Sequence, residues 1–275
     1  MSLKISPLVW LELQKKSIVK NVSALKEKTG AKSPLVNVSA NALGFGAQSF
    51  VRGLIGANVA GFVVDTIEEA LELRRLGTNK TILVTEPITN QNLPIFNENL
   101  LIGSVYSRNT LEELAQNKIP TTIALTPSTE NLSEALPSNL KLWGEYEITP
   151  NKADPLSGRY NDDFIFGTFV YGINGGKSVL TLRSRVIDVN GSEALIGLGM
   201  KDGFSFDFAG YQLAIGQIKE VRLSNTLISL THPVQPGDII TIVDDLVKVA
   251  DYLKITPWEL STRFNPSISR EFISF

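Results

Sequence analysis

The sequence predicts an α/β protein in which an incomplete or modified TIM-like (β/α) barrel precedes a small β-rich domain. Between residues 34 and 171, seven apolar runs of strand length alternate with helical segments. Parallel strands that are buried on both faces appear as continuous apolar runs, and helices connect them. Beyond residue 176 the pattern changes to short strand-like runs joined by turn residues. We therefore expect a barrel domain over residues 1–175 and a β domain over residues 176–275.

The helices of the barrel region are marked by their end signals. Ile18, Val22 and Leu25 fall on one helical face, which predicts a helix over about 14–28 that stops at Gly30. Residues 65–69 offer two overlapping capping boxes, Asp65 with Glu68 and Thr66 with Glu69, before a helix that ends at Gly77. Further helices are predicted over about 48–55 and 109–116.

The apolar runs predict the strands, but they do not decide whether the sheet closes. They lie at residues 34–38, 59–64, 81–85, 100–106, 121–125, 140–146 and 164–171. A closed barrel and an open doubly wound sheet both fit this alternation. Residues 8–176 are also too few for a typical eightfold barrel of about 250 residues, so we expect a barrel that is shortened after its sixth strand.

The β-rich region ends in two predicted helices. Its strand-like runs lie at residues 178–189, 194–198, 211–215, 220–223, 226–230 and 238–243. A helix over 245–253 and a second over 257–264 follow, the second with Thr256 as N-cap, Pro257 at N1 and Glu259 at N3.

Composition excludes several classes of function. With 26 basic and 28 acidic residues the net charge is -2, which gives no electrostatic basis for binding nucleic acid or an anionic membrane. The chain has no cysteine and a single histidine, His232, which excludes disulfides, thiol nucleophiles and zinc sites built from several histidines. No window approaches the roughly 18 apolar residues of a membrane span. We expect a cytoplasmic protein with no nucleic-acid or membrane partner, and His232 as a turn residue.

Residues 38–46 carry the most specific motif, Val-Ser-Ala-Asn-Ala-Leu-Gly-Phe-Gly. It resembles the first barrel strand of alanine racemases, which reads Val-Lys-Ala-Asn-Ala-Tyr-Gly-His-Gly. Residues 164–172 (FIFGTFVYG) resemble the last barrel strand of that family, Val-Arg-Pro-Gly-Ile-Ala-Leu-Tyr-Gly. Collinear resemblances continue at residues 61–76, 81–84, 198–204, 234–238 and 258–264. The order of barrel, β domain and terminal helices is that of the fold-type III pyridoxal-phosphate enzymes.

The resemblance places other residue types at the family's chemical positions. The Schiff-base lysine falls at Ser39, the arginine at the pyridine nitrogen falls at Ile165, and the tyrosine that acts as second acid/base falls at Met200. The remaining equivalents are Leu43 for a phosphate-binding tyrosine, Phe45 for a histidine, Gly167 and Thr168 on the last strand, Trp258 for a tyrosine, and Leu223-Ser224 for a Met-Asp pair. We expect no catalytic residue at these positions and no bound cofactor, with pyridoxal phosphate only the cofactor of the family.

The resemblance thus implies a racemase-like protein that acts as a non-catalytic binding or structural module. It also implies a homodimer, because in the family each pocket is completed by the partner's C-terminal domain. The alternative is a pyridoxal-phosphate-dependent amino-acid racemase or isomerase, or another enzyme with a remodelled site at the barrel mouth, in which Lys201 could supply a relocated amine. A small-molecule ligand at the barrel mouth remains open in either case.

Polar residues at the carboxyl ends of the apolar runs are further site candidates, because barrel enzymes carry their catalysis there. Glu145 and Glu147 are the pair of greatest interest, since alternate residues of a strand face one side and two carboxylates can tune each other's pKa. The simpler interpretations are a loop position for Glu147, a helix cap for Asp65 and a solvated turn for Lys201. The candidates are Ser39, Asn41, Asp65, Glu86, Ser107, Thr126, Glu145, Glu147 and Asn174.

Overall fold

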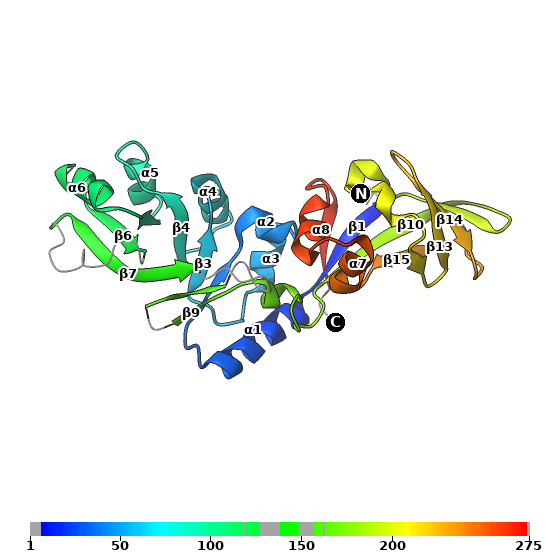
Figure 1. Cartoon of the computed structure of the whole chain (residues 1–275), viewed down its shortest axis with the longest axis horizontal. Helices are drawn as coiled ribbons and strands as arrows, with labels where there is room; N and C mark the ends of the chain where they lie inside the picture. Colours follow the sequence, from blue (N-terminus) through cyan, green and yellow to red (C-terminus); the bar gives the residue numbers. More distant parts are fainter. Residues whose placement is uncertain (1–6, 118, 127–137, 149–156, 162, 274–275) are drawn as a thin grey trace, which may run out of the picture. The chain divides into compact units, whose positions relative to one another are not determined.

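The computed structural model describes residues 7–117, 119–126, 138–148, 157–161 and 163–273, and these divide into two compact units (Figure 1). The barrel unit holds the described residues of 19–42 and 54–170. The sheet unit holds the described residues of 1–18, 43–53 and 171–275. Neither unit is one continuous stretch of chain.

The barrel unit is built on eight strands that form a curled, closed sheet. The strands are β2 (Leu35–Asn37), β3 (Gly61–Val64), β4 (Thr81–Pro87), β5 (Ile102–Val105), β6 (Thr121–Leu125), β7 (Leu140–Ile148), β8 (Gly158–Tyr160) and β9 (Asp163–Phe166). Successive strands from β2 to β7 pair in parallel, and β9 pairs in parallel with β2 to close the ring. The predicted modified barrel followed by a β-rich domain is confirmed.

Strand β8 completes the barrel in a way that the apolar runs did not indicate. It pairs antiparallel with both β7 and β9, with Tyr146 opposite Tyr160 and Tyr160 opposite Asp163. A parallel pair needs a crossover of a dozen or more residues, whereas antiparallel strands need only a tight turn. Asn161, in the turn after β8, has a φ of 47°, a backbone conformation that asparagine tolerates well. The antiparallel hairpin therefore lets a shortened chain close the ring.

Three helices cover the outer face of this sheet, as Figure 1 shows: α4 (Ile67–Arg75), α5 (Leu93–Glu98) and α6 (Arg108–Gln116). Thr66 is the N-cap of α4 and forms the predicted capping box with Glu69, while Gly77 follows the helix with a φ of 83°. Ser107 caps α6 by accepting a hydrogen bond from the Thr110 backbone. Helix α5 was not predicted. Its N-terminal residues carry no side-chain cap bond that would have marked it.

The barrel is filled by one side chain or more from every strand. Strand residues Leu35, Val63, Leu83 and Ile165 are each at most 1% exposed, and Tyr146 and Tyr160 add large aromatic volume. Trp143 packs against this cluster and stacks on Tyr160, with ring centroids 5.1 Å apart. The barrel therefore has a solid apolar centre, and the polar chemistry lies at its ends.

The sheet unit centres on a long twisted sheet. The strands run in the order β12 (Gln212–Leu213), β13 (Gly216–Val221), β14 (Thr226–Leu230), β11 (Glu193–Ile196), β10 (Leu180–Asn190), β1 (Val9–Gln14) and β16 (Ser269–Ile273), and β15 (Ile239–Val243) also pairs with β10. Thus β1 (Val9–Gln14) lies between two strands that are far from it in the sequence, antiparallel to β10 and parallel to β16.

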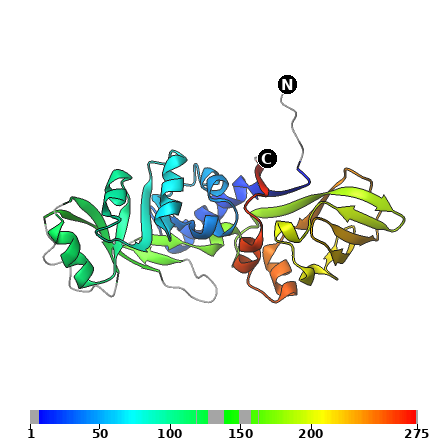
Figure 2. The same ribbon diagram turned by 90° about the horizontal axis from the view of Figure 1, so that it is seen from above.

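Two helices accompany this sheet, α7 (Leu246–Leu253) and α8 (Pro257–Arg263), and they lie side by side in both views (Figures 1 and 2). Thr256 caps α8 with Pro257 in its first turn, as predicted. Helix α1 (Lys15–Thr29) leads from β1 into the barrel unit, and α3 (Ala47–Gly53) belongs to the sheet unit.

Gly44, in the motif over residues 38–46, is required by a close approach. Its φ is 78°, and a Cβ atom there would lie 2.1 Å from the backbone oxygen of Ser261. A larger residue would therefore displace the end of α8 or the loop itself. This glycine has a scaffold role.

Candidate functional site

Ser39 lies at the carboxyl end of β2, where barrel enzymes place catalytic groups. Its backbone nitrogen donates to the side-chain oxygen of Asn37 at 3.0 Å, and the residue is 1% exposed. Among the described residues, no atom is hydrogen-bonded to Ser39 Oγ. A buried hydroxyl without a partner costs about 1–3 kcal/mol.

The residues after Ser39 form a short left-handed turn, α2 (Ser39–Leu43). Ala40, Asn41 and Ala42 have φ near 53° and ψ near 50°, and Leu43 has a φ of 51°. This conformation costs roughly 1–2 kcal/mol for each residue with a Cβ atom, so the turn stores several kcal/mol. Such strain persists where the surrounding structure enforces it, and it concentrates at functional sites.

Two hydrogen bonds from outside hold this turn within the barrel unit. The backbone nitrogen of Ala42 donates to the oxygen of Val38 at 2.9 Å. The backbone nitrogen of Asn41 donates to Glu69 Oε1 at 3.2 Å. Glu69 also accepts from the backbone nitrogen of Asp65 at 3.0 Å through its other oxygen. One carboxylate therefore fixes both the strained turn and the start of α4.

A chain of three hydroxyls lies at the same barrel end, at strands β5 and β7, which flank β6. Tyr146 on β7 contacts both Tyr106 Oη and Ser104 Oγ at 2.8 Å. Tyr106 donates to the Thr85 oxygen at 2.6 Å, and Ser104 donates to the Val84 oxygen at 2.5 Å. Three hydroxyl hydrogens thus serve four contacts, so at least one hydrogen is shared between two acceptors.

Burial raises the pKa of Tyr146 well above its ordinary value of 10.0, and the nearby hydroxyl of Tyr106 and carboxylate of Asp65 add to this effect. Tyr146 is 4% exposed, whereas Tyr106 is 41% exposed. The chain therefore runs from a buried neutral phenol to one that solvent or a ligand can reach. A sequence signal for it existed, since Ser104 and Tyr106 are two residues apart on one strand face.

Asp65 and Glu86 have structural partners at this end of the barrel. Asp65 Oδ1 accepts from the Thr85 hydroxyl at 3.0 Å, and Glu86 Oε2 accepts from the Ile67 backbone nitrogen at 2.9 Å. The prediction of Asp65 as the helix cap is wrong, because Thr66 occupies the N-cap position and Asp65 instead joins β3 to β4. Neither carboxylate is placed as an isolated acid or base.

The last barrel strand, β9, contains Ile165, which the resemblance places at the position of the arginine at the pyridine nitrogen. Ile165 is 1% exposed and belongs to the barrel core, opposite Leu35 of β2. The predicted strand over 164–171 ends earlier, at Phe166, and Thr168–Tyr171 form a 3₁₀ turn that begins after Gly167. Thr168 is fully buried. The residue at position 165 is therefore a hydrocarbon that fills space in the core.

The remaining barrel-end candidates have modest roles where the structure describes them. Thr126 is 8% exposed and its hydroxyl donates to the Val105 oxygen at 3.4 Å, while Ser107 is a helix cap. Asn174, in the sheet unit, lies in an exposed turn with a φ of 57°. The side chains of Glu145 and Glu147 lie outside the described residues.

Leu43 and Phe45, which follow the turn, belong to the sheet unit. Phe45 is fully buried, with its ring 5.8 Å from that of Phe50 and 5.1 Å from that of Tyr171, both edge to face. Leu43 is 5% exposed. Both side chains are apolar core in that unit.

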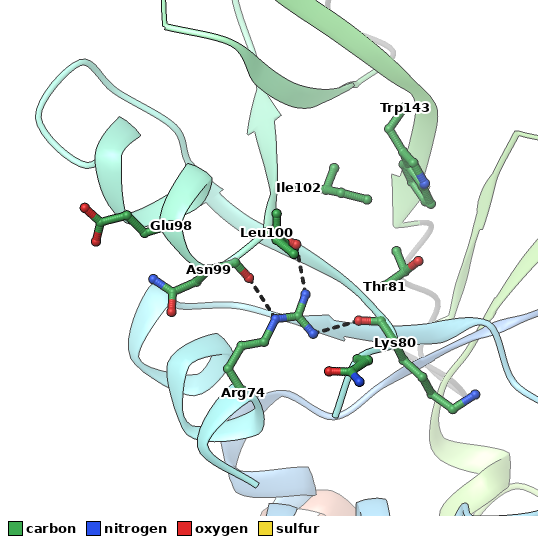
Figure 3. Close-up of a pocket in the computed structure, with 9 residues that line it drawn as sticks. Arg74, Lys80, Thr81, Glu98, Asn99, Leu100, Ile102 and Trp143 are labelled. Atoms are coloured by element: carbon green, nitrogen blue, oxygen red, sulfur yellow. Dashed lines mark hydrogen bonds between the residues drawn. The ribbon is translucent and has the colours of Figure 1, made fainter. Parts of the chain in front are cut away.

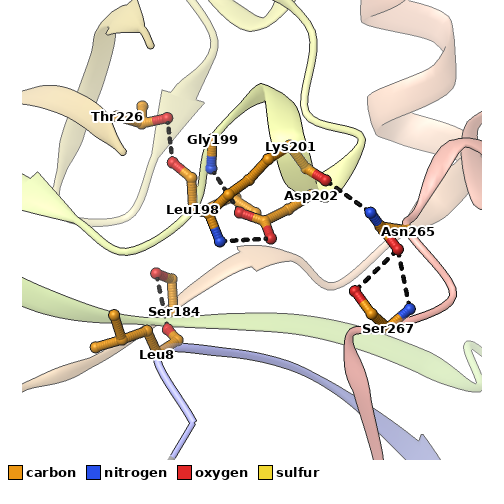
Figure 4. Close-up of polar contacts among 9 residues, drawn as sticks. All are labelled: Leu8, Ser184, Leu198, Gly199, Lys201, Asp202, Thr226, Asn265 and Ser267. Atoms are coloured by element: carbon orange, nitrogen blue, oxygen red, sulfur yellow. Dashed lines mark hydrogen bonds and ion pairs between the residues drawn. The ribbon is translucent and has the colours of Figure 1, made fainter. Parts of the chain in front are cut away.

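Met200 begins a 3₁₀ turn, Met200–Asp202, and is partly exposed. The Lys201 ammonium pairs with Asp202 Oδ1 at 3.2 Å, and Asp202 Oδ2 accepts from the Gly199 backbone nitrogen at 3.0 Å (Figure 4). The Asn265 side chain donates to the Lys201 oxygen at 2.9 Å. This carboxylate and amide fix the turn, and the lysine amine is occupied by an ion pair.

Two more candidates of the sheet unit occupy its surface. Trp258, in the first turn of α8, is partly exposed, and its backbone oxygen accepts from the Ser261 and Thr262 hydroxyls. His232 is exposed and contacts the Thr231 hydroxyl, as a turn residue would. In the part of the chain that the structure describes, no three His, Asp or Glu side chains are grouped to hold a metal ion, and no helix is long and apolar enough to cross a membrane.

Comparison with known proteins gives a family match over part of the chain. Residues 13–126 match the family described as alanine racemase, N-terminal domain. This segment is therefore similar to the N-terminal domain of alanine racemases. Racemases of this family depend on pyridoxal phosphate, and the strained turn and Ser39 both lie inside the matched segment.

Curated relatives match parts of the chain. It is 36% identical over 104 residues to an alanine racemase of Actinobacillus succinogenes, which covers 38% of this chain and 29% of that protein. It is 34% identical over 108 residues to one of Haemophilus influenzae, covering 39% and 30%. It is also 25% identical over 151 residues to a lysine racemase of Oenococcus oeni, covering 54% and 40%. The matched segments thus span less than a third of the two alanine racemases.

Solved structures extend the likeness of fold to nearly the whole chain. An alanine racemase from E. faecalis superposes with a TM-score of 0.83 at 18% identity, covering 99% of this chain and 100% of that one. A histidine racemase from Leuconostoc mesenteroides superposes with a TM-score of 0.77 at 18% identity, covering 97% and 98%. At these identities the likeness shows the fold alone.

Proposed function

We propose that this protein does not racemise amino acids and acts as a non-catalytic binding or structural module. The observation that carries the proposal is Ser39, which occupies the position where the resemblance places the Schiff-base lysine of the family. A serine hydroxyl cannot form an imine, and here it is buried with no described hydrogen-bond partner. The proposal also includes the absence of a resident cofactor.

The residues at the other equivalent positions do not fit pyridoxal phosphate. The pyridine nitrogen needs a polar or charged partner, and Ile165 offers only a hydrocarbon in the barrel core. Phe45 and Leu43 are buried apolar side chains with no donor for a phosphate. Met200 has no hydroxyl to donate or accept a proton. We therefore derive no step through this cofactor.

The size of the expected loss in racemisation rate supports a protein without racemase activity. One general acid or base contributes typically about 10²- to 10⁴-fold, and racemisation needs one on each face of the substrate. The cofactor supplies the electron sink that makes removal of the α-proton feasible. A site with none of these three groups has no route to the reaction.

The test combines trapping with turnover. Purified protein is mixed with pyridoxal phosphate and then with borohydride, and peptides are examined by mass spectrometry, with the alanine racemase of Haemophilus influenzae as positive control. We expect the control to carry a reduced adduct on one lysine, while this chain shows none above background and does not racemise L-alanine. A stoichiometric adduct on one lysine, or measurable racemisation, overturns the proposal.

A second candidate function is an enzyme with different chemistry at the same end of the barrel. The hydroxyl chain of Ser104, Tyr146 and Tyr106 favours it, because it joins a buried neutral phenol to an exposed one. The ion pair of Lys201 with Asp202 argues against that lysine as a relocated amine. A turnover that is lost in Tyr106→Phe and unchanged in Lys201→Ala would establish this candidate.

We also propose that the protein is a homodimer. In the sheet unit, Phe206 and Leu223 are 63% and 65% exposed, and Leu223 lies in the loop whose backbone oxygen holds Lys201. Large apolar side chains with this much exposure are candidates for an interface between subunits. Light scattering should give a dimer mass at micromolar concentration, and Phe206→Ser with Leu223→Ser should give a monomer. A monomer mass for the unmodified chain refutes this proposal.

A further inference from the structure

Two Asn-Gly pairs occur in the sequence, Asn174-Gly175 and Asn190-Gly191, and both lie at turns of the sheet unit. An asparagine before a glycine is prone to attack by the glycine backbone nitrogen on the asparagine side chain, because glycine has no Cβ atom that hinders the approach. The attack needs a backbone N–H that donates no hydrogen bond and a side-chain amide that is free to rotate. The two pairs differ in both respects.

Asn190-Gly191 meets these requirements at the tip of the hairpin that joins β10 to β11. Gly191 and Ser192 form the two-residue turn, and Gly191 has a φ of 60°. Asn190 and both turn residues are exposed. Among the described residues, none is hydrogen-bonded to the Asn190 side chain or to the Gly191 nitrogen. A Cβ atom at Gly191 would meet no atom within 4 Å, so the side chain has room to close on the backbone.

The reaction at this tip disturbs little of the sheet. Asn190 and Glu193 are the last pair of the ladder between β10 and β11, and Val189 and Ala194 are the pair before it. Pairs at the end of a ladder open at low free-energy cost. Rotation of the Asn190 backbone towards its own side chain therefore requires only the terminal pair to open.

Asn174-Gly175 is held more firmly. Ile173, which precedes it, is fully buried. Gly172 approaches the following chain so closely that a Cβ atom there would lie 2.4 Å from the Lys177 backbone oxygen. Asn174 itself also has an interaction partner. The backbone rotation that the attack needs is therefore more restricted at Asn174 than at the hairpin tip.

We propose that Asn190 is a site of spontaneous deamidation. The Gly191 nitrogen forms a bond to the side-chain carbonyl carbon of Asn190, the bond from that carbon to the amide nitrogen breaks, and the Gly191 N–H proton leaves with this nitrogen as ammonia. Water then opens the cyclic imide at one of its two carbonyl carbons, which gives aspartate or β-aspartate. Each event adds one negative charge to the chain. This site is independent of the proposed function.

The new carboxylate lies where the hairpin already carries negative charge. It faces Glu193 directly across the ladder, and Asp188 lies two residues away on the same strand. Glu193 is already ion-paired with Lys219. Like charges opposite each other weaken strand pairing, and a β-aspartyl link also lengthens the backbone, which disrupts the terminal pair. Deamidation should therefore loosen the tip of this hairpin.

The test follows both Asn-Gly pairs of the full chain in one sample. The protein is incubated at mildly alkaline pH, and each conversion raises the mass of its peptide by about 1 Da. In the folded protein, Asn190 should convert at least about threefold faster than Asn174. In concentrated urea the two rates should agree within about twofold, because both pairs are then in a flexible chain. An isoaspartyl methyltransferase with a labelled methyl donor should label the aged folded protein at position 190.

Three variants separate the reaction from its consequences. Asn190→Gln should lose the methyl label at position 190 and leave the conversion of Asn174 unchanged. The matched control Asn174→Gln should leave the conversion of Asn190 unchanged. Asn190→Asp adds the charge without the longer backbone, so it should raise amide hydrogen exchange at residues 188–193 less than ageing does.

Three results overturn the proposal. The first is an unconverted Asn190 in the folded protein, and the second is conversion of Asn174 at the same rate or faster. The third is a ratio of the two rates that is the same in urea as in the folded protein, since the structure would then have no influence on the reaction.

Discussion

The hydroxyl oxygens of Tyr106 and Tyr146 lie 2.8 Å apart, and Tyr146 makes a second contact of the same length with Ser104. Tyr106 and Ser104 each donate their hydroxyl hydrogen to a backbone oxygen. The single hydroxyl hydrogen of Tyr146 is therefore shared between two acceptors. The group that ties β5 to β7 at the barrel end is thus a phenol that stays neutral over a wide pH range.

Tyr146→Phe tests this relationship through pH. At pH 7 we expect the variant to be about 1 kcal/mol less stable, the usual net value of one buried hydrogen bond. The pKa of Tyr146 is raised in the folded state, so its contribution is complete below pH 10 and falls as pH rises above it. Above pH 10 the free energy of unfolding of the unmodified protein therefore falls by up to about 1.4 kcal/mol for each pH unit. The urea-unfolding curves of the two proteins should therefore converge and cross near pH 11.

The comparison isolates Tyr146 because other tyrosines act equally in both proteins. Burial also raises the pKa of Tyr160, to about 12, and that of Tyr211. Their effects cancel in the difference between the two stabilities. Parallel stability profiles between pH 8 and pH 11.5 would contradict the assignment.

Ala40→Gly should stabilise the protein. Ala40 is exposed and has a φ of 54°, so its Cβ atom adds strain and little packing. Glycine adopts this conformation without that cost but loses more entropy on folding, which leaves a net gain of about 1 kcal/mol. Ala115→Gly in the right-handed helix α6 is the matched control and should lose about 1 kcal/mol. If both variants are destabilised equally in urea unfolding, the left-handed turn is not strained.

Ser39→Ala should be neutral or stabilising by up to about 1 kcal/mol, because it removes a buried hydroxyl that has no described partner. Ser104→Ala should instead cost about 1–3 kcal/mol, because Ser104 Oγ bonds both the Val84 oxygen and Tyr146. Thermal unfolding of the two variants, measured side by side, gives the comparison. A clear loss of stability in Ser39→Ala would show that this hydroxyl has a bonded partner.

Arg74→Ala should destabilise the protein by about 2 kcal/mol, since four backbone oxygens lose their donor at hydrogen bonds that are part-buried or exposed (Figure 3). Arg74→Lys should recover little, because an ammonium cannot reach oxygens arranged around a planar guanidinium. Arg75→Ala is the control. Arg75 is exposed and makes one long bond to Leu71, so its loss should stay within about 0.5 kcal/mol. Equal losses in Arg74→Ala and Arg75→Ala would contradict the role of Arg74.

The strands and helices of the barrel were predictable where they depend on residues that are close together in the sequence. The apolar run at residues 121–125 became β6 with the same bounds, and the Thr66–Glu69 capping box begins α4 as expected. Cap bonds and apolar periodicity act within a few residues, so the sequence displays them directly. Helix α5 lacks such a cap bond and was missed.

The candidate site was predictable in part. The motif over residues 38–46 correctly marked an unusual segment, but apolar periodicity gives no sign that Ala40 to Leu43 turn left-handed. Tyr106 and Tyr146 were overlooked because they are apolar in bulk and end apolar runs, 40 residues apart. Only their position on strands β5 and β7, with β6 between them, makes them neighbours.

By itself, the sequence determined the alternation of strands and helices, the caps, the change of pattern near residue 176 and the serine at position 39. The tertiary structure alone decided that β8 closes the barrel as an antiparallel strand and that β1 lies between β10 and β16. It also decided which carbonyls hold Arg74 and which hydroxyls meet Tyr146. The physical reason is that strand pairing and burial join residues far apart in the chain, where no local periodicity records the partner.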